Sequence, residues 1–269
     1  MDAMQVNHPL GMYNNLPPED VFLITDEMGG EMGVGYVIYQ FQPHLYPDCP
    51  INLYFTMDCQ PAARYMLFGA LIARARQLRD CNPTVRARVY TNIAPTDTMM
   101  KDFYLHAGFD CSDSEDILRL PIPPGDGRIP MSCAVVATAL NTPEEQSAML
   151  CRLAQNDVTY IDQNYLNQLR AQPHFMALGL YRNTELVGEV IMAGEGDSCE
   201  LAAIYITPPS RRQGMGRALL HRCMAIMAAE GVTHVTARIM NRSQPQRRLV
   251  SAFHAEVTGV NMLFPGLYL

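Results

Sequence analysis

Several kinds of residue and pattern are scarce or missing in this chain of 269 residues. It has no tryptophan, and its 8 cysteines are scattered without a C-x-x-C pair. Scattered cysteines favour reduced thiols over a disulfide framework or a zinc site, so we expect a cytoplasmic protein without a bound metal. An apolar run of about 18 residues is also missing, and the N-terminus lacks the pattern of a signal peptide. We therefore expect no association with a membrane.

A basic surface is not expected either. The chain has 20 Lys and Arg against 27 Asp and Glu, a formal net charge of −7. Because phosphate backbones are bound by positively charged surfaces, nucleic acid is not the expected partner. Hydrophobic residues make up 48% of the chain, which is ample for a core, and the length suggests one large or two small domains.

The most informative stretch runs from Leu201 to Glu230. It begins with an apolar, partly β-branched run of strand length, Leu201 to Thr207, and two prolines end this strand. Six residues with two glycines and two arginines follow, Arg211 to Gly216. Apolar residues then recur at the spacing of one helical face: Met215, Leu219, Cys223 and Ile226. The pattern predicts a strand, a glycine-bearing loop and a helix.

This arrangement suits a diphosphate. A helix N-terminus has unpaired backbone N–H groups and partial positive charge. Gly214 and Gly216 remove side chains that would keep a ligand off those amides, and Arg211, Arg212 and Arg217 add formal positive charge. The same features occur in an ordinary strand-to-helix turn with solvated arginines, so the loop alone does not decide between the two interpretations.

The whole string is more specific. R-R-Q-G-M-G-R-A-L-L, preceded by Y-I-T-P-P, closely resembles the acetyl-CoA loop of the GNAT acetyltransferase superfamily. The family pattern, (Gln or Arg)-x-x-G-x-(Gly or Ala), is filled by Arg211, Gly214 and Gly216. A Walker loop is excluded because no G-K-[ST] follows. A dinucleotide fingerprint is excluded because Leu219 stands at the place of its third glycine.

The two halves of the chain also repeat each other. Arg64 and Gly69 precede Arg211 and Gly216 by 147 residues. Further matched pairs are Tyr54-Phe55-Thr56 with Tyr205-Ile206-Thr207, Asn92 with Asn241, and Phe103-Tyr104 with Phe253-His254. A series of matches in order indicates tandem units. The string F-Y-L-H-A-G-F at Phe103 to Phe109 resembles the family's F-Y-x-x-x-G-F, although Tyr104 would also suit a hydrophobic core.

The resemblance implies an α/β fold of two GNAT-like units, each a mixed, mostly antiparallel sheet flanked by helices. The linker composition of Pro121 to Pro130 puts the units at residues 1–125 and 131–269. Leu67 stands where the second unit has Gly214, so we expect a degenerate first unit and acetyl-CoA binding in the second. We expect the second unit to end with a helix from Gln244 to Glu256 and a strand from Met262 to Leu269.

Site residues follow from the same resemblance. The acetyl-CoA contacts it implies are Ile204, Tyr205, Ile206, Thr207, Arg211, Arg212, Gln213, Gly214, Met215, Gly216 and Arg217. Asn241 is either a further contact or a helix N-cap. An amine that attacks the thioester must first be neutral, which requires a base or a water path, and the leaving thiolate requires an acid. The candidate base is Glu200, with Glu189 and Asp197 as alternatives. The candidate acid is His254, with Tyr205 within reach.

We therefore expect an N-acyltransferase that moves an acetyl group from acetyl-CoA to a primary amine of a small molecule or a protein. The acidic balance favours a cationic acceptor. The alternative is a non-catalytic acyl-CoA-binding or interaction module, because a fold alone does not establish turnover. Only catalysis requires Glu200 or His254, and Glu200 at a strand start could equally be a solvated edge carboxylate. Whether the chain forms a homodimer is left open.

Overall fold

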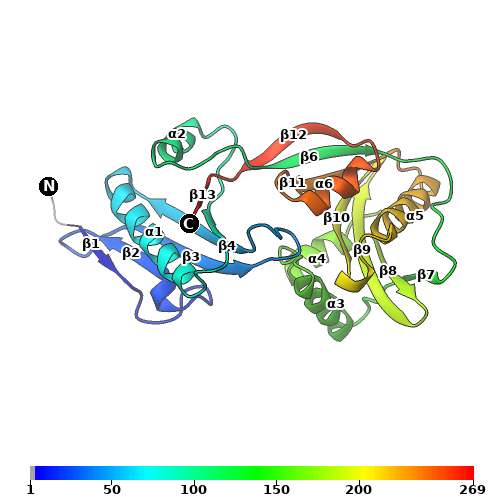
Figure 1. Ribbon diagram of the computed structural model, residues 1–269, viewed down its shortest axis with the longest axis horizontal. Coiled ribbons are helices and arrows are strands. Elements are labelled where there is room, and N and C mark those ends of the chain that lie inside the picture. The colour runs from blue at the N-terminus through cyan, green and yellow to red at the C-terminus, as the bar shows by residue number, and fades with distance from the viewer. Residues whose placement is uncertain (1–3) are drawn as a thin grey trace. The chain divides into compact units, whose positions relative to one another are not determined.

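A computed structural model of the protein describes residues 4–269, which form two compact units (Figure 1). The first unit contains residues 4–114 and Met262–Leu269, and the second contains Glu115–Asn261. Each unit has a mixed sheet flanked by helices, so the expected α/β fold class is confirmed. Within residues 4–269, no helix is long and apolar enough to cross a membrane.

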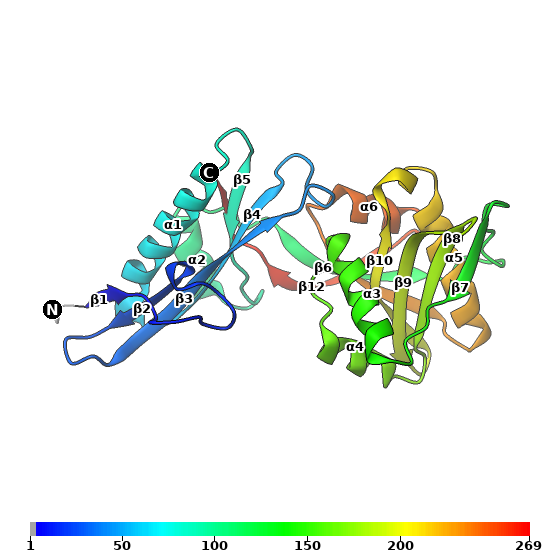
Figure 2. The ribbon, with the colours of Figure 1, turned by 90° about the horizontal axis from the view of Figure 1, so that it is seen from below.

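The first unit has a six-stranded sheet in the order β1-β2-β3-β4-β5-β13. Its only parallel pair among those described is β4 with β5. The strands are β1 Gln5–Asn7, β2 Val21–Thr25, β3 Glu31–Phe41, β4 Ile51–Cys59, β5 Ala87–Tyr90 and β13 Gly266–Tyr268. The helices are α1 Arg64–Asp80 and α2 Thr98–His106. Figure 2 shows α1 running along the sheet, and Leu67, Leu71 and Ala75 of α1 are fully buried against it.

The second unit has a seven-stranded sheet in the order β12-β6-β11-β10-β9-β8-β7. The strands are β6 Ser114–Pro121, β7 Cys133–Ala137, β8 Met176–Arg182, β9 Glu185–Glu195, β10 Ser198–Ile206, β11 His234–Met240 and β12 Glu256–Leu263. The β10–β11 pair is parallel, and both strands have an antiparallel neighbour on the other side.

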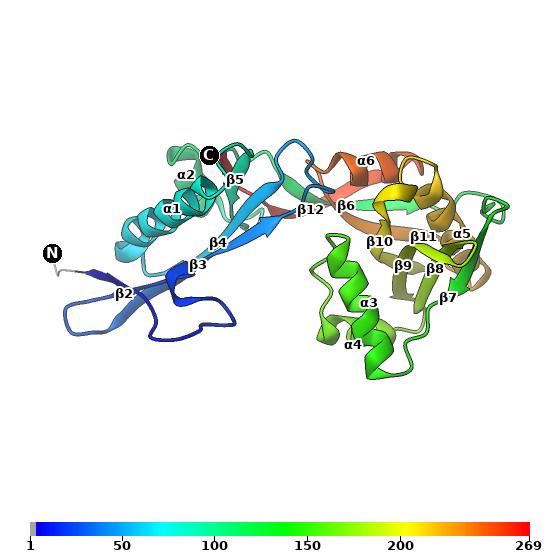
Figure 3. The same cartoon turned by 60° about the horizontal axis from the view of Figure 1, so that its bottom comes forward.

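Helices cover both faces of this second sheet. On one face lie α5 Met215–Ala229 and α6 Gln244–Ser251 (Figure 1). On the other face lie α3 Pro143–Gln155 and α4 Gln163–Arg170 (Figure 3). The predicted capping box at the start of α3 is present, because Thr142 and Glu145 each bind the other's backbone N–H. Two separate cores result, one on each face of the sheet.

The units divide at different places from the expected ranges of 1–125 and 131–269. Strand β6 pairs with β11 of the second sheet, with Leu118 opposite Ala237. Strand β13 pairs with β5 of the first sheet, with Leu267 opposite Val89. Residues 115–125 therefore belong to the second unit, and residues 262–269 belong to the first. Alternation in a sequence predicts a strand, but it does not name the strand's partner.

The internal repeat is visible in element boundaries. Strands β4 and β10 are both 9 residues long and start at residues 51 and 198. The short 3₁₀ turns Pro61–Ala63 and Pro208–Ser210 keep the same offset of 147. At that offset the counterpart of Tyr205 is Asp58, so the expected match of Tyr54 with Tyr205 is wrong in register. Both strands contain aromatic residues, and the match of the two halves therefore paired tyrosines that do not occupy equivalent positions.

Candidate active site

The site begins where strands β10 and β11 stop pairing. Their parallel pairs run from Ser198 opposite His234 to Leu201 opposite Ala237, although β10 continues to Ile206 and β11 to Met240. The register of β10 shifts between Leu201 and Ala203, which marks a β-bulge. Strand β9 stays paired along the rest of β10. The other edge of residues 203–206 is therefore not taken up by β11, and such an edge can bind an extended ligand through its backbone.

The loop after β10 is held in shape by its own side chains. Arg211 donates from Nε to the Ile206 carbonyl oxygen at 2.6 Å, and Gln213 donates to the Pro209 carbonyl oxygen at 3.0 Å. Arg182 of β8 donates to the side chain of Gln213 at 2.6 Å. Partial burial of Arg211 lowers the pKa of its guanidinium through desolvation. Arg211 thus joins the strand end to the loop, whereas Arg212 and Arg217 are exposed.

The two glycines of the loop lie at the start of α5. Gly214 is its N-cap, with φ of 77°, a left-handed conformation that favours glycine. A Cβ atom on Gly214 would meet nothing within 4 Å, and one on Gly216 would lie 3.5 Å from Ile206 and 3.6 Å from Leu249. The first amides of a helix have no partner inside it. Here they adjoin open space beside exposed arginines, and this donor set fits a diphosphate.

The equivalent segment of the first unit has a different structure. Helix α1 begins at Arg64, directly after the 3₁₀ turn, and Ala63 before it is right-handed. Leu67 is fully buried inside this helix instead of standing in a loop. Gly69 lies in the middle of the helix with nothing within 4 Å of its Cβ position. A continuous helix therefore replaces the glycine loop, and these residues do not fit a diphosphate.

Tyr205 belongs to a buried polar cluster. Its hydroxyl donates to Oε2 of Glu189 at 2.6 Å, and Arg152 of α3 donates to both carboxylate oxygens at 2.8 Å. Burial and the Glu189 carboxylate raise the pKa of Tyr205, so the phenol stays protonated at neutral pH. Both carboxylate oxygens of Glu189 are therefore already engaged by side-chain donors. The structure thus brings two sequence candidates, Glu189 and Tyr205, into contact.

Glu200 lies near the bulge and has a different partner. Arg238 of β11 donates to it from Nε at 2.9 Å, and Arg238 also donates to the Tyr165 hydroxyl at 3.2 Å. The hydroxyl of Tyr160 donates to the Ala202 carbonyl oxygen, inside the bulge, at 2.7 Å. Sequence reasoning missed Tyr160 and Tyr165. The available signal was a pair of tyrosines five residues apart in a polar segment, T-Y-I-D-Q-N-Y.

His254 was expected on a helix, but α6 ends at Ser251. His254 lies in the following turn, exposed, with φ of 53°. Asp197 lies in the turn before β10, where its carbonyl oxygen accepts from the Thr233 N–H at 2.8 Å. Asn241 directly follows β11. Within residues 4–269, no hydrogen bond or ion pair joins Glu200, Tyr205 and His254 to one another.

Tyr104 of the first unit is 2% exposed, and its ring lies 5.5 Å from that of Phe109. Burial raises the pKa of its hydroxyl. These contacts favour the core interpretation of this residue. No group of three or more His, Cys, Asp or Glu side chains in the described part of the chain is arranged to hold a metal ion.

Comparisons with known proteins agree with this geometry. Residues 144–254, all within the second unit, match the acetyltransferase (GNAT) family. The second unit therefore contains a GNAT acetyltransferase domain, and the protein is an enzyme of the acyl-transfer class. A search of curated proteins found no match.

Two solved structures show the same fold over nearly the whole chain. A GCN5-related N-acetyltransferase from Sphaerobacter thermophilus is 14% identical, with a TM-score of 0.51, over 95% of this chain and 82% of its own. Eis1 from Mycobacterium abscessus is 14% identical, with a TM-score of 0.55, over 97% of this chain and 73% of its own. At this identity the likeness concerns the fold.

Proposed function

We propose that the protein transfers an acetyl group from acetyl-CoA to a primary amine of a small molecule or a protein. This proposal rests on one observation, the course of β10 relative to β11. The strand parts from β11 after Leu201 and leads directly to the glycine loop at the N-terminus of α5. Strand β10 thus offers an open backbone edge for the extended arm of acetyl-CoA and, at the end of the strand, backbone amides for its diphosphate.

The chain's residues divide into two groups along that path. The diphosphate would be held by the loop, with Gly214 and Gly216 opening the amides and Arg212 and Arg217 supplying charge. The arm would follow the backbone of Ile204 to Thr207, which directs the acyl end toward the bulge. Gln213 and Met215 complete the loop, and Asn241 lies at the end of β11, the strand that separates from β10. The first unit, without a glycine loop, would not bind acetyl-CoA.

Proton transfer is proposed for the residues near the bulge. Glu200 lies beside it and is the proposed base, acting directly or through water on the acceptor ammonium. Arg238 keeps Glu200 in place through an ion pair. His254 is the proposed acid for the leaving thiolate. Tyr205 is a second candidate, although its proton is already donated to Glu189.

The test measures thiol release from acetyl-CoA in the presence of a panel of amines, for the wild-type protein and for Gly214→Leu. We expect amine-dependent thiol release from the wild type, and neither acetyl-CoA binding nor turnover in the variant. Tight acetyl-CoA binding without turnover of any amine would instead favour the non-catalytic module. Wild-type protein that does not bind acetyl-CoA would contradict both.

A further inference from the structure

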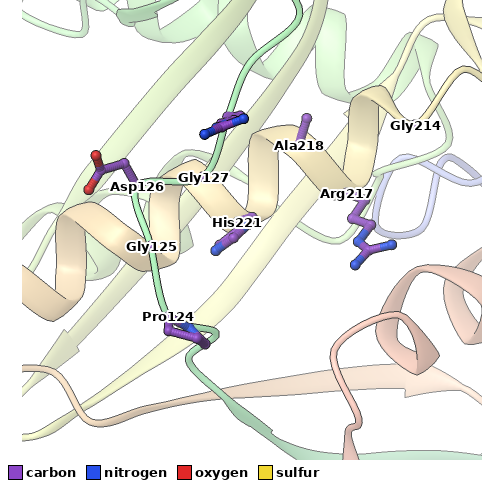
Figure 4. A pocket seen from close by; sticks show the side chains of 9 residues that line it. Pro124, Gly125, Asp126, Gly127, Gly214, Arg217, Ala218 and His221 are labelled. Carbon is purple, nitrogen blue, oxygen red and sulfur yellow. The ribbon is translucent and has the colours of Figure 1, made fainter.

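A second feature of the second unit lies beside the glycine loop. A cavity of about 400 Å³ lies between the N-terminal half of α5 and residues 124–128, in the segment that joins β6 to β7 (Figure 4). One wall is formed by the N-cap Gly214 and by Arg217, Ala218 and His221 of α5, and this spacing puts them on one helical face. The other wall is Pro124 to Arg128. The volume falls within the range of small-molecule sites.

The segment that forms the other wall, residues 124–128, packs against α5. Arg222 donates to the Asp126 carbonyl oxygen at 2.9 Å. Gly127 has φ of 61°, and a Cβ atom there would lie 2.5 Å from the backbone nitrogen of Arg222. Such an approach is compatible only with glycine, so any other residue would force the segment away from the helix. The cavity is therefore bounded by a segment that packs directly against α5.

The lining is cationic. Arg128 and Arg217 are exposed guanidinium groups on opposite walls. His221 is half-buried, and its Nε2 atom is buried without a hydrogen-bond partner among residues 4–269. Asp126 is the one acidic residue of the lining, and its side chain points away from Arg217 in Figure 4. Two guanidinium groups and a single acidic side chain leave this lining with an excess of positive charge, which favours an anionic ligand.

We infer that this cavity holds the phosphate monoester on the ribose of CoA, and that Arg128 and His221 make the enzyme prefer CoA over 3′-dephospho-CoA. The inference rests on the proposed function, since Gly214 belongs to both the cavity and the diphosphate loop. Arg217 and His221 follow Gly214 by about one and two helical turns, or roughly 5 and 10 Å along the axis. A second phosphate at such a distance from a diphosphate is what the adenosine end of CoA carries.

The segment between β6 and β7 thereby acquires a role in specificity. Arginine binds phosphate oxygens in a bidentate manner, and an imidazole N–H adds a further donor. Arg128 comes from outside the loop and helix that hold the diphosphate. Its loss should therefore affect recognition of the ribose phosphate and leave the diphosphate contacts in place.

Isothermal titration of the full chain with CoA and with 3′-dephospho-CoA tests this. We expect the wild type to bind CoA at least about tenfold more tightly, since hydrogen bonds to charged groups contribute about 1.5 kcal/mol or more. In Arg128→Ala and in His221→Ala this preference should fall to near unity, with unchanged affinity for 3′-dephospho-CoA. The control is Arg170→Ala, which removes an exposed arginine at the end of α4 and should keep the preference.

Two results would overturn the inference while the proposed function stands. One is equal affinity of the wild type for both molecules. The other is an equal loss of affinity for both in Arg128→Ala, which would indicate general attraction of anions. If the wild type binds neither molecule, the proposed function fails and the inference fails with it. Arg128 is exposed, so Arg128→Ala decides the question even if His221→Ala does not fold.

Discussion

The hydroxyl of Tyr205 donates to Oε2 of Glu189 at 2.6 Å, from the directly opposite position on the neighbouring strand. Glu189 is 1% exposed, and Arg152 reaches its carboxylate from α3 on one face of the sheet. A buried carboxylate is tolerated only with such partners. The cluster therefore joins α3 to the two central strands beside the candidate active site.

The first prediction concerns Arg152→Ala. This change leaves the buried carboxylate of Glu189 without its cationic partner. We expect the free energy of unfolding to fall by about 3 kcal/mol, the lower end for a broken buried pair, because Arg152 itself is 34% exposed. Urea denaturation measures the loss. Arg170→Ala, the matched exposed arginine, should change stability by less than about 0.5 kcal/mol.

A second variant separates charge from packing at this cluster. Adding Glu189→Gln to Arg152→Met removes both charges while the glutamine can still accept from Tyr205. We expect this pair to be more stable than Arg152→Ala alone. Wild-type stability in Arg152→Ala would show that the ion pair contributes nothing.

The second prediction compares three glycines. Gly214→Ala strains a left-handed residue and should weaken acetyl-CoA binding strongly, whereas Gly216→Ala adds a methyl group with only ordinary contacts and should weaken binding less. Gly69→Ala is the matched change in the first unit. Because Gly69 is exposed inside α1, this variant should gain about 0.5 to 1 kcal/mol of stability and keep acetyl-CoA binding. Weaker binding in Gly69→Ala would contradict the assignment of the site to the second unit.

Much of the loop could be predicted because its signals are local. The prolines after Ile206, the glycines at 214 and 216 and the helical spacing from Met215 all lie within about 20 residues. The predicted helical face begins at Met215, which is also the first residue of the observed helix. In contrast, the expectation that the first unit is degenerate was based on the alignment of Leu67 with Gly214 of the second unit. A buried leucine in a continuous helix and a leucine in a loop look the same in a sequence.

The third prediction concerns proton transfer. Glu200→Gln and His254→Ala should each lower kcat by about 10²- to 10⁴-fold and leave the Kd of acetyl-CoA nearly unchanged. If Glu200 is the base, Glu200→Gln should also flatten the acid limb of the pH–rate profile. Glu195→Gln, an exposed carboxylate at the end of β9, is the control and should match the wild type. Full activity in both variants would remove these two roles.

The fourth prediction follows from the unit boundaries. A fragment of residues 115–261 contains all the residues of the second unit and should unfold cooperatively. A fragment of residues 131–269 lacks β6, which pairs with β11 along seven residues, and should be unstable or aggregated. Circular dichroism during thermal unfolding distinguishes the two. A stable 131–269 fragment would show that β6 is dispensable.

The fifth prediction concerns alkaline pH. Burial raises the pKa of the Cys223 thiol from 9.0 to about 12. Between these values the unfolded chain loses this proton and the folded chain keeps it, so the contribution is complete below pH 9 and is lost as the pH rises. The slope is about 1.4 kcal/mol per pH unit. Urea unfolding from pH 9.5 to 10.5 should show a shallower decline in Cys223→Ala and an unchanged decline in Cys81→Ala, which alters an exposed cysteine.

The partners of β6 and β13 could not be predicted for a physical reason. The segment of β13 was predicted to be a strand, but Leu267 lies opposite Val89, far away in the sequence. Neighbouring strands in a sheet share no sequence pattern that specifies such a pairing. The position of His254 was missed for a local reason. The helix ends at Ser251, and His254 lies three residues later with a left-handed backbone, although histidine carries no strong stop signal.

The pairing of β13 with β5 has a consequence for biosynthesis. Strand β5 emerges from the ribosome well before Gly266 to Tyr268, which cover its free edge. The whole second unit can fold in the interval, because its residues are contiguous. Until β13 has emerged, the first sheet exposes an open edge that can recruit other strands. A chaperone that protects such edges would therefore act on the N-terminal part of this protein during translation.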